Sequence, residues 1–453
     1  MSLDTSPSPA SAARPATARR AGRSDGELDR RRPLPAWPLA WLLVATPLWW
    51  LLGTIDFVIV PIAVVMVYYL RRSTHVRVPR GFAIWLIFLL FMLASGIEIT
   101  KFNSYFTFAY RAGIYLGSTV VFVYVYNSRR WIPDRKVLQY LVWYLVTMTV
   151  GGFLGAVKPI GQFRTPTYYV LAKVSPFLVS NDLVKVMVVR PFSQYDPTNY
   201  FQIPPRPTAP FIFTNNWGNA YSMVLPLVLI YFLESPKRSW QRRLSGLLLP
   251  VSAVPAMLTL NRGMFIGLGI VAVYVGLRLA ARGYLGRVVL SAAVAGGIGL
   301  VLWKALNVSA GLHTRVEAST DTRASLYDQA LHSVQSSPLF GYGVTIQSTS
   351  TNPWDPKVGT QGQFWMVLIS HGVIATACFV GFFLVAVVLT FRRRDFAGMV
   401  CNAVVLAGVI ETIYYGLVPY GLPLLMIAAA LAWRPAPVAR SRLSEAEPGV
   451  PRP

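Results

Sequence analysis

Long apolar runs alternate with short polar joints along most of the chain. About twelve of these runs are long enough to cross roughly 30 Å of hydrocarbon as a helix with a rise of 1.5 Å per residue. They cover approximately 36–53, 54–70, 81–98, 104–126, 137–156, 216–233, 244–260, 263–280, 288–305, 363–391, 396–416 and 417–433. The pattern predicts an all-α, polytopic membrane protein of about twelve transmembrane helices, with a membrane domain at 36–433. The joints at Gly53, Arg262 and near Gly416 are the weakest boundaries, because no polar segment separates the runs there.

Four segments lie outside these runs. Residues 1–35 and 434–453 are rich in Pro, Ala and Arg, have no apolar core, and predict disordered tails. The segments at about 157–215 and 306–362 are long connections. The first is rich in proline and aromatic residues, and the second contains RASLYDQALHSVQ, which we expect to form an amphipathic helix.

Composition supports a membrane class. Hydrophobic residues make up 54% of the 453 residues and charged residues 13%, whereas a soluble chain carries about a quarter charged residues. The mean hydropathy is +0.48. The formal charge of +24 would suggest nucleic acid in a soluble protein, but the basic residues gather in short joints, so we expect no nucleic-acid partner.

The basic joints predict the orientation of the chain. They read RRSTHVRVPR, NSRRWIPDRK, ESPKRSWQRR, ARGYLGR and RRRD. Under the positive-inside rule these five joints and both tails face the cytoplasm. The segments at 157–215 and 306–362 then lie outside.

The ionisable residues that lie within or beside the runs fall in the predicted outer half. These residues are Asp56, Glu98, Arg111, Arg262, Lys304, His371 and Glu411. Each has an ordinary structural explanation: an arginine can snorkel or pair with a carboxylate, as Arg111 could with Glu98 or Glu411, and a histidine can pack. Together they predict a polar chamber that opens to the outside and holds more cations than carboxylates.

Such a chamber suits an anion whose tail stays in lipid, and a lipid-linked pyrophosphate has that form. Arginine binds phosphate through two parallel hydrogen bonds, and we take Arg111 as one candidate for substrate binding. If a sugar is transferred from such a carrier, negative charge grows on the leaving pyrophosphate. Guanidinium groups already in position would stabilise that transition state.

Three short motifs follow one another over about 260–385. LTLNRGMFIGLGI carries Arg-Gly at the start of a run, TRASLYDQALHSVQSSPLFGYGV combines an arginine with Pro-Leu-Phe-Gly and a second glycine, and GTQGQFWMVLISHGVIATACFVGFFL enters a run. Their order and spacing resemble the O-antigen ligase and polymerase superfamily. Members of that family are integral membrane glycosyltransferases of bacteria.

The resemblance implies transfer of a glycan from undecaprenyl pyrophosphate to a glycan or lipid acceptor at the outer face of the bacterial cytoplasmic (inner) membrane. It implies that Arg262 and Arg323 contact the pyrophosphate, and Arg315 is a neighbouring candidate for substrate binding. It also implies that the segment at 306–362 covers the site. Arg315 and Arg323 could equally be solvated charges of an external segment.

One departure from the family concerns the general base. The family usually has His-Asn where this chain has Gln361-Gly362, and a glutamine cannot accept a proton at neutral pH. Either another residue is the base, or departure of pyrophosphate drives the step with little help from a base. The candidates for the base are His371, Glu411, His313 and Asp321. The chain could also use a different acceptor or be a non-catalytic relative.

The sequence contains no Asp-x-Asp pair, no P-loop and no GxGxxG after a strand. Because no carboxylate cluster offers hard oxygen ligands, we expect a metal-independent enzyme without a cofactor. Two other classes remain open. A transporter or flippase with twelve helices would bind a lipid-linked oligosaccharide or another anion near the midplane, and a non-enzymatic scaffold would tolerate the loss of Arg262 and Arg323.

Overall fold

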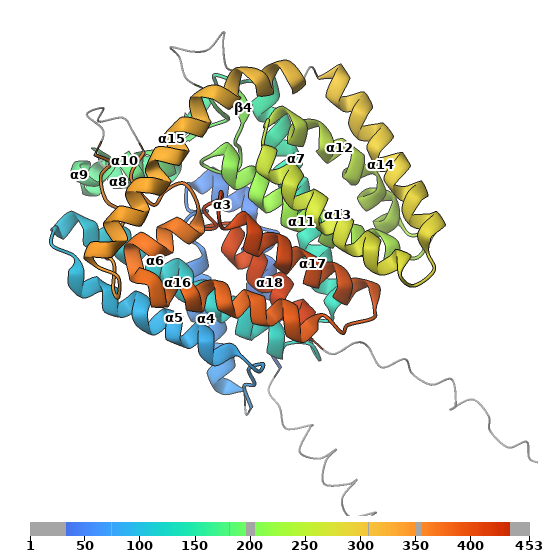
Figure 1. The fold of residues 1–453 in the computed structure, drawn as a ribbon, viewed down its shortest axis with the longest axis horizontal. Coiled ribbons are helices and arrows are strands. Elements are labelled where there is room, and N and C mark those ends of the chain that lie inside the picture. The colour runs from blue at the N-terminus through green and yellow to red at the C-terminus, as the bar shows by residue number, and fades with distance from the viewer. Residues whose placement is uncertain are drawn as a thin grey trace, which may run out of the picture.

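The computed structural model describes residues 33–73, 75–180, 182–195, 204–306, 308–349 and 356–434, and the side chains of these except 177–178, 182–183 and 309–322. The predicted tails at 1–35 and 434–453 lie almost entirely outside these residues. The described chain is mostly helical (Figure 1).

Each of the predicted apolar runs falls on helix in the structure. The helices are α2 (Trp37–Leu43), α3 (Thr46–Leu52), α4 (Ile59–Arg72), α5 (Phe82–Ala94) with the 3-10 turn η1 (Ser95–Glu98), α6 (Phe102–Asn127), α7 (Asp134–Val157), α11 (Thr214–Glu234), α12 (Trp240–Leu258), α13 (Arg262–Ala280), α14 (Leu285–Ala305), α16 (Gln363–Thr390), α17 (Phe396–Glu411) and α18 (Gly421–Trp433). The run at 36–53 is split into α2 and α3, and each half has a proline in its first turn. Proline fits there because the first N–H groups of a helix have no partner in the helix.

Five of these helices, α6, α7, α13, α14 and α16, are long and apolar enough to cross a membrane by themselves. The chain is therefore a multi-pass membrane protein. Other apolar helices, such as α17 and α18, are shorter. The number of twelve spans stays a prediction.

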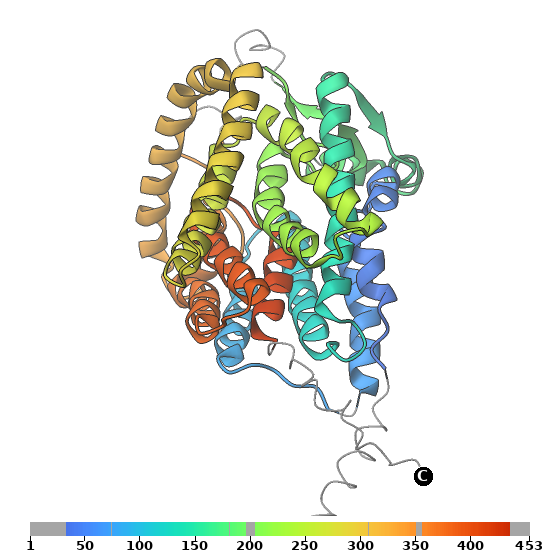
Figure 2. The same cartoon turned by 90° about the vertical axis from the view of Figure 1, so that its right-hand side faces the viewer.

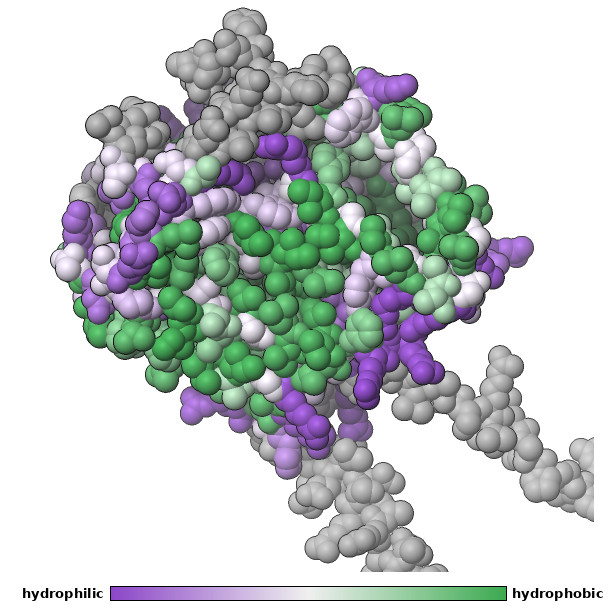
Figure 3. Space-filling view, viewed as in Figure 1, coloured by the Kyte–Doolittle hydropathy of each residue, from purple (hydrophilic) through white to green (hydrophobic). Residues whose placement is uncertain are grey.

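The five basic joints lie together at one end of the helix bundle, which we call the basic-loop end. Four of them are joined by the contacts Arg77–Asn127, Asp134–Arg434, Arg393–Arg434 and Arg282–Arg394. The fifth, ESPKRSWQRR, follows the end of α11, where Arg135 lies over the ring of Tyr231. Figure 2 shows the joint at 75–81 in light blue at the bottom and the green strands at the top. Figure 3 shows a broad apolar area across the middle of one face, with hydrophilic side chains below it and at its upper left. We call the end that carries the strands the opposite end.

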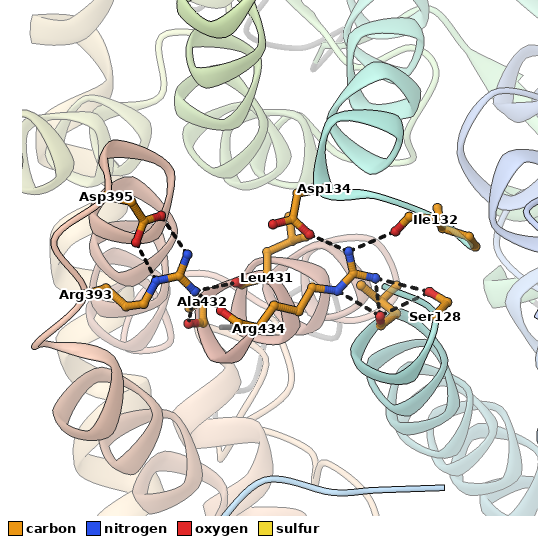
Figure 4. A network of polar contacts seen from close by, with 9 residues as sticks. Ser128, Ile132, Asp134, Arg393, Asp395, Leu431, Ala432 and Arg434 are labelled. Carbon is orange, nitrogen blue, oxygen red and sulfur yellow. Dashed lines mark hydrogen bonds and ion pairs between the residues drawn. The ribbon is translucent and has the colours of Figure 1, made fainter. Parts of the chain in front are cut away.

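Two buried or half-buried arginines organise the basic-loop end (Figure 4). The Arg434 guanidinium is fully buried and donates to Ile132 O at 3.1 Å and to the Asp134 carboxylate at 2.6 Å. The Arg393 guanidinium pairs with Asp395 at 2.6 Å and donates to Ala432 O at 3.0 Å. Together they tie the C-terminal end of α18 to the joints before α7 and α17.

We predict that Asp395→Ala lowers the stability of the protein by about 1–2 kcal/mol at pH 7, because Asp395 is the N-cap of α17. Its Oδ2 accepts from Gly398 N at 2.8 Å. Burial alone would raise the pKa of Asp395, but the hydrogen bonds from Arg393 and Gly398 lower that pKa below its ordinary value. A lowered folded-state pKa stabilises the protein at neutral pH, and this contribution is lost as the pH falls through that value.

The measurement is the unfolding temperature in detergent across pH. The difference between wild type and Asp395→Ala should shrink below about pH 4. Asp395→Asn is the matched control, since its amide oxygen still caps the helix but pairs less strongly with Arg393. An equal difference at all pH values would contradict this account.

The segment between α7 and α11 has more structure than the loop that the sequence predicted. It forms β1 (Gln162–Arg164), α8 (Pro166–Val174), α9 (Pro176–Ser180), α10 (Asp182–Val188), β2 (Val189–Pro191), β3 (Ser193–Gln194) and β4 (Arg206–Pro207). Strands β1 and β2 pair antiparallel, as do β3 and β4. These strands are short, and the fold remains dominated by helices.

The second long segment contains α15 (Val308–Ser336). The amphipathic helix predicted over RASLYDQALHSVQ is confirmed as part of this longer helix. In Figure 1, α15 runs along the upper left of the molecule and meets α16.

Helix α16 is broken at Gly372, which has φ 82°. The loop that follows α15 fills the break: Tyr342 N donates to Ile369 O at 2.9 Å, and Val373 N donates to Pro338 O at 2.8 Å. The SPLFGYG motif therefore supplies hydrogen bonds that an unbroken helix would have made within itself.

We predict that Gly372→Ala destabilises the protein by about 2–3 kcal/mol. Gly372 has a backbone conformation that L-residues rarely adopt, and a Cβ there would lie 2.6 Å from Pro338 O. Gly381→Ala in the same helix is the control, because a Cβ at Gly381 meets only Ile84 Cγ2 at 3.8 Å and alanine favours helix. Unfolding temperatures should fall for Gly372→Ala and stay level or rise for Gly381→Ala; equal effects would contradict the role given to the break.

Candidate functional site

The three motifs of the sequence meet at one turn, Thr412–Tyr415, which follows α17 at the opposite end of the bundle. Gln363 N donates to Tyr415 O at 2.7 Å, and Phe364 N donates to Thr412 O at 2.9 Å. The start of α16 is therefore fastened to this turn by its backbone. A Cβ at Gly362 would overlap the carbonyl of Ile413, so this approach depends on glycine.

Arg262 is exposed at the first position of α13, beside the same turn. The Tyr414 hydroxyl donates to Gly263 O at 3.3 Å, and Asn261 Nδ2 donates to Thr214 O at 2.6 Å. Before them Leu260 has φ 51°, which is uncommon for a residue with a Cβ. These contacts fix the reversal between α12 and α13, at which the Arg262 side chain is exposed.

Arg323 belongs to α15, whose next turn contacts the Thr412–Tyr415 turn. The rings of Tyr327 and Trp365 stack with centroids 4.4 Å apart. The Tyr327 hydroxyl donates to Ile413 O at 3.4 Å, and Trp365 Nε1 donates to the same oxygen at 3.1 Å. Residues four apart share one face of a helix, so half-buried Arg323 lies on the face of α15 that turns toward this site.

His371 is buried in a second polar cluster beside the break in α16. Its Nδ1 lies 2.7 Å from Ser95 Oγ, and its ring lies edge-on to that of Tyr115, one turn along α6 from Arg111. Arg111 Nη2 lies 3.5 Å from Thr345 Oγ1. Among the described residues, His371 Nε2 and Arg111 Nη1 are buried without a hydrogen-bond partner.

The ion pairs that we considered for Arg111 are not formed. Within the described part of the chain, Arg111 makes no ion pair with Glu98 or Glu411. Glu98 is exposed, and Glu411 is turned toward α11. Among the described side chains, therefore, no carboxylate lies within ion-pair distance of the Arg111 guanidinium.

Gln363 is a buried residue of the site that sequence reasoning missed. Its Nε2 donates to the Tyr115 hydroxyl at 2.6 Å, and its Oε1 accepts from Leu417 N at 2.9 Å. One amide side chain thus joins α6, α16 and the segment before α18. Gln361, which the sequence singled out, is half-buried and donates to Thr360 Oγ1 at 3.3 Å.

Glu411 is fully buried between α11, α13 and α17. Its Oε2 accepts from Asn219 Nδ2 at 2.6 Å, and a Cβ at Gly267 would overlap its Oε1. Enclosed in this way, Glu411 joins helices directly below the Thr412–Tyr415 turn. The sequence could have pointed to Asn219, because a polar side chain within an apolar run needs a hydrogen-bond partner.

A buried ion pair fixes the strand-bearing segment to the bundle. Arg190 of β2 donates to Asp56 Oδ2, and the Tyr420 hydroxyl donates to Asp56 Oδ1. Arg190 and Asp56 are both fully buried.

The predicted site residues thus separate into three groups. Arg262, Arg323 and Gln361 have exposed or half-buried side chains and lie within four residues of Gly263, Tyr327 and Gly362, which contact the Thr412–Tyr415 turn. Arg111, His371 and Glu411 lie further inside. The side chain of Arg315, like those of His313 and Asp321, lies outside the residues whose side chains are described.

The described residues include no group of three or more His, Cys, Asp or Glu side chains that could hold a metal ion. The candidate site is cationic, because guanidinium groups lie at this end of the bundle. Amide and hydroxyl groups that can form hydrogen bonds lie behind them, and apolar helices lie on either side. These are the elements needed to bind a phosphorylated headgroup whose chain stays in lipid.

Comparison with protein-family models and with curated proteins finds no match for this chain. The assignment of a function therefore rests on the three motifs and on the geometry that joins them.

Proposed function

We propose that the chain is a metal-independent membrane glycosyltransferase of the O-antigen ligase and polymerase type. It would transfer a glycan from a polyprenyl-pyrophosphate carrier to a glycan or lipid acceptor. The reaction would take place at the opposite end of the bundle, which the positive-inside rule assigns to the outer face of a bacterial cytoplasmic membrane, with both termini in the cytoplasm.

One observation carries this proposal. The three motifs that resemble the family are far apart in the sequence, yet contacts from all three meet at the Thr412–Tyr415 turn: Gly263 with Tyr414, Tyr327 with Ile413, and Gln363 with Tyr415. A shared contact point is what a single reaction centre requires, since its groups must act on one substrate.

The proposed step breaks the bond between the anomeric carbon of the donor sugar and the pyrophosphate oxygen. The acceptor hydroxyl oxygen attacks that carbon, the bonding electron pair leaves with the pyrophosphate, and the hydroxyl proton passes to a base or to water. Arg262 and Arg323 would hold the pyrophosphate and stabilise its growing charge. Arg111 and Arg315 would extend this binding.

Gln361 would orient the acceptor hydroxyl and not take its proton. His371 and Glu411 are enclosed by protein, which supports positioning roles for both, His371 at the break of α16 and Glu411 beneath the turn. The proposal therefore assigns most of the driving force to departure of the pyrophosphate.

The test is deletion of the gene followed by analysis of lipid-linked glycans in the membrane. The proposal expects single repeat units or unligated chains to accumulate on the carrier at the outer leaflet. Wild-type chain should clear them, whereas Arg262→Ala should not. Absence of any accumulated carrier-linked glycan would refute the proposed function.

A transporter or flippase is the second candidate, and the break at Gly372 favours it, because transporters often bind substrate at broken helices. The same lipid analysis separates the two. A flippase predicts that carrier-linked glycan accumulates on the cytoplasmic leaflet, whereas the transferase predicts the outer leaflet.

A further inference from the structure

An open depression of about 510 Å³ lies at the basic-loop end, away from the site described above. It is lined by Ser73, His75, Arg77, Tyr126, Asn127, Arg129, Arg130 and Trp131. None of these residues is acidic, and three are arginines. The depression is therefore a cationic pocket, which we call the basic pocket.

Asn127 gives the basic pocket a defined shape. Its Oδ1 accepts from Arg77 N at 2.8 Å, and its Nδ2 donates to Arg77 O at 2.8 Å. Asn127, the last residue of α6, thus binds both the backbone N–H and the backbone carbonyl of Arg77 in the extended segment 75–79. Arg77 cannot drift from the end of α6 without breaking two hydrogen bonds.

The extended segment has two different faces. Side chains alternate along an extended chain, so His75 and Arg77 share the face that lines the pocket. Val76 and Val78 share the other face and are 46% and 50% exposed. A cationic face and an exposed apolar face on one short segment fit the boundary between lipid headgroups and acyl chains.

Two aromatic residues support the same location. Tyr126 and Trp131 line the pocket and are half-buried, and both types are enriched where membrane meets water. The Asp134 carboxylate, three residues after Trp131, is paired with Arg434. The ends of α4 and α6 carry partial negative charge, so the arginines and not the helix ends would attract an anion.

We propose that the basic pocket binds the phosphate of an anionic phospholipid headgroup, with Arg77 and Arg129 as its ligands and the acyl chains beside Val76 and Val78. This inference does not rest on the proposed glycosyltransferase activity. Basic pockets between membrane helices are suited to such headgroups, because each arginine adds a favourable charge interaction with the phosphate.

The test titrates the purified full-length chain in detergent with phosphatidylglycerol or phosphatidylcholine, and native mass spectrometry counts the bound lipid. We expect phosphatidylglycerol to bind more tightly than phosphatidylcholine. The double variant R77Q/R129Q should weaken phosphatidylglycerol by about 30-fold, which is about 2 kcal/mol. The matched control R243Q/R287Q removes two exposed basic side chains outside the pocket and should change binding less than threefold.

Three results would overturn the proposal. Equal binding of the two lipids, or equal loss in R77Q/R129Q and R243Q/R287Q, would mean that the pocket does not recognise the headgroup. Displacement of phosphatidylglycerol by inorganic phosphate at the same concentration would assign the pocket to a soluble anion. Unfolding temperatures measured without added lipid show whether the R77Q/R129Q protein is folded, and Asn127 is kept so that the segment stays attached.

Discussion

Arg262→Ala is expected to lower the rate of glycan transfer by about 10²–10³-fold, the loss that follows removal of one preformed group that stabilises transition-state charge. Arg262 is exposed at the start of α13, so its loss should leave the fold intact. The measurement is a pulse-chase of carrier-linked glycan in cells whose only copy is the variant. Arg323→Ala should have an effect of the same order.

Two variants make this result specific. Arg262→Lys keeps the charge but not the two parallel hydrogen bonds that a guanidinium makes to phosphate, and should give an intermediate rate. Arg287→Ala removes an exposed arginine at the basic-loop end and should match wild type. If Arg287→Ala slowed turnover as much as Arg262→Ala, the effect would come from total charge and not from a site.

The largest loss of stability is expected for Arg190→Ala, at about 3–5 kcal/mol. This variant leaves the Asp56 carboxylate buried without the cation that balances it, and an unpaired buried charge is costly. The same change frees β2 from the bundle, so the strand-bearing segment should become open to protease before the helices unfold. Unfolding temperature and limited proteolysis in detergent measure both effects.

The control for this prediction removes both charges together. In the double variant Asp56→Asn with Arg190→Met, the Tyr420 hydroxyl can still donate to the amide oxygen and no charge remains buried. We expect most of the lost stability to return, because replacing both partners of a buried pair is often nearly neutral. A double variant as unstable as Arg190→Ala would mean that packing, and not charge, fixes β2.

The helices could be predicted from the sequence because their signal is local. An apolar run is recognisable without knowledge of its neighbours, and even the doubtful joint at Gly53 is a real helix end with φ 82°. The run predicted at 396–416 extends too far, since α17 ends at Glu411. The apolar composition of this run does not reveal that Thr412–Tyr415 forms a turn whose backbone carbonyls bind the start of α16.

The interior of the candidate site could not be predicted, because its pairs join residues far apart in the chain. Gln363 and Tyr115 are 248 residues apart, and Asn219 and Glu411 are 192 apart. The sequence marked Glu411 as costly in an apolar run but could not name its partner. The family motif made Gln361 a candidate site residue, whereas the buried hydrogen bonds are made by Gln363, two residues further along.

The most direct measurement is a structure of the full-length chain bound to a polyprenyl pyrophosphate. The account predicts that the pyrophosphate lies beside the Thr412–Tyr415 turn, with oxygens about 2.7–2.9 Å from the guanidinium nitrogens of both Arg262 and Arg323, and that its chain lies against the apolar helices. A pyrophosphate bound at the basic-loop end, or held by neither arginine, would contradict it.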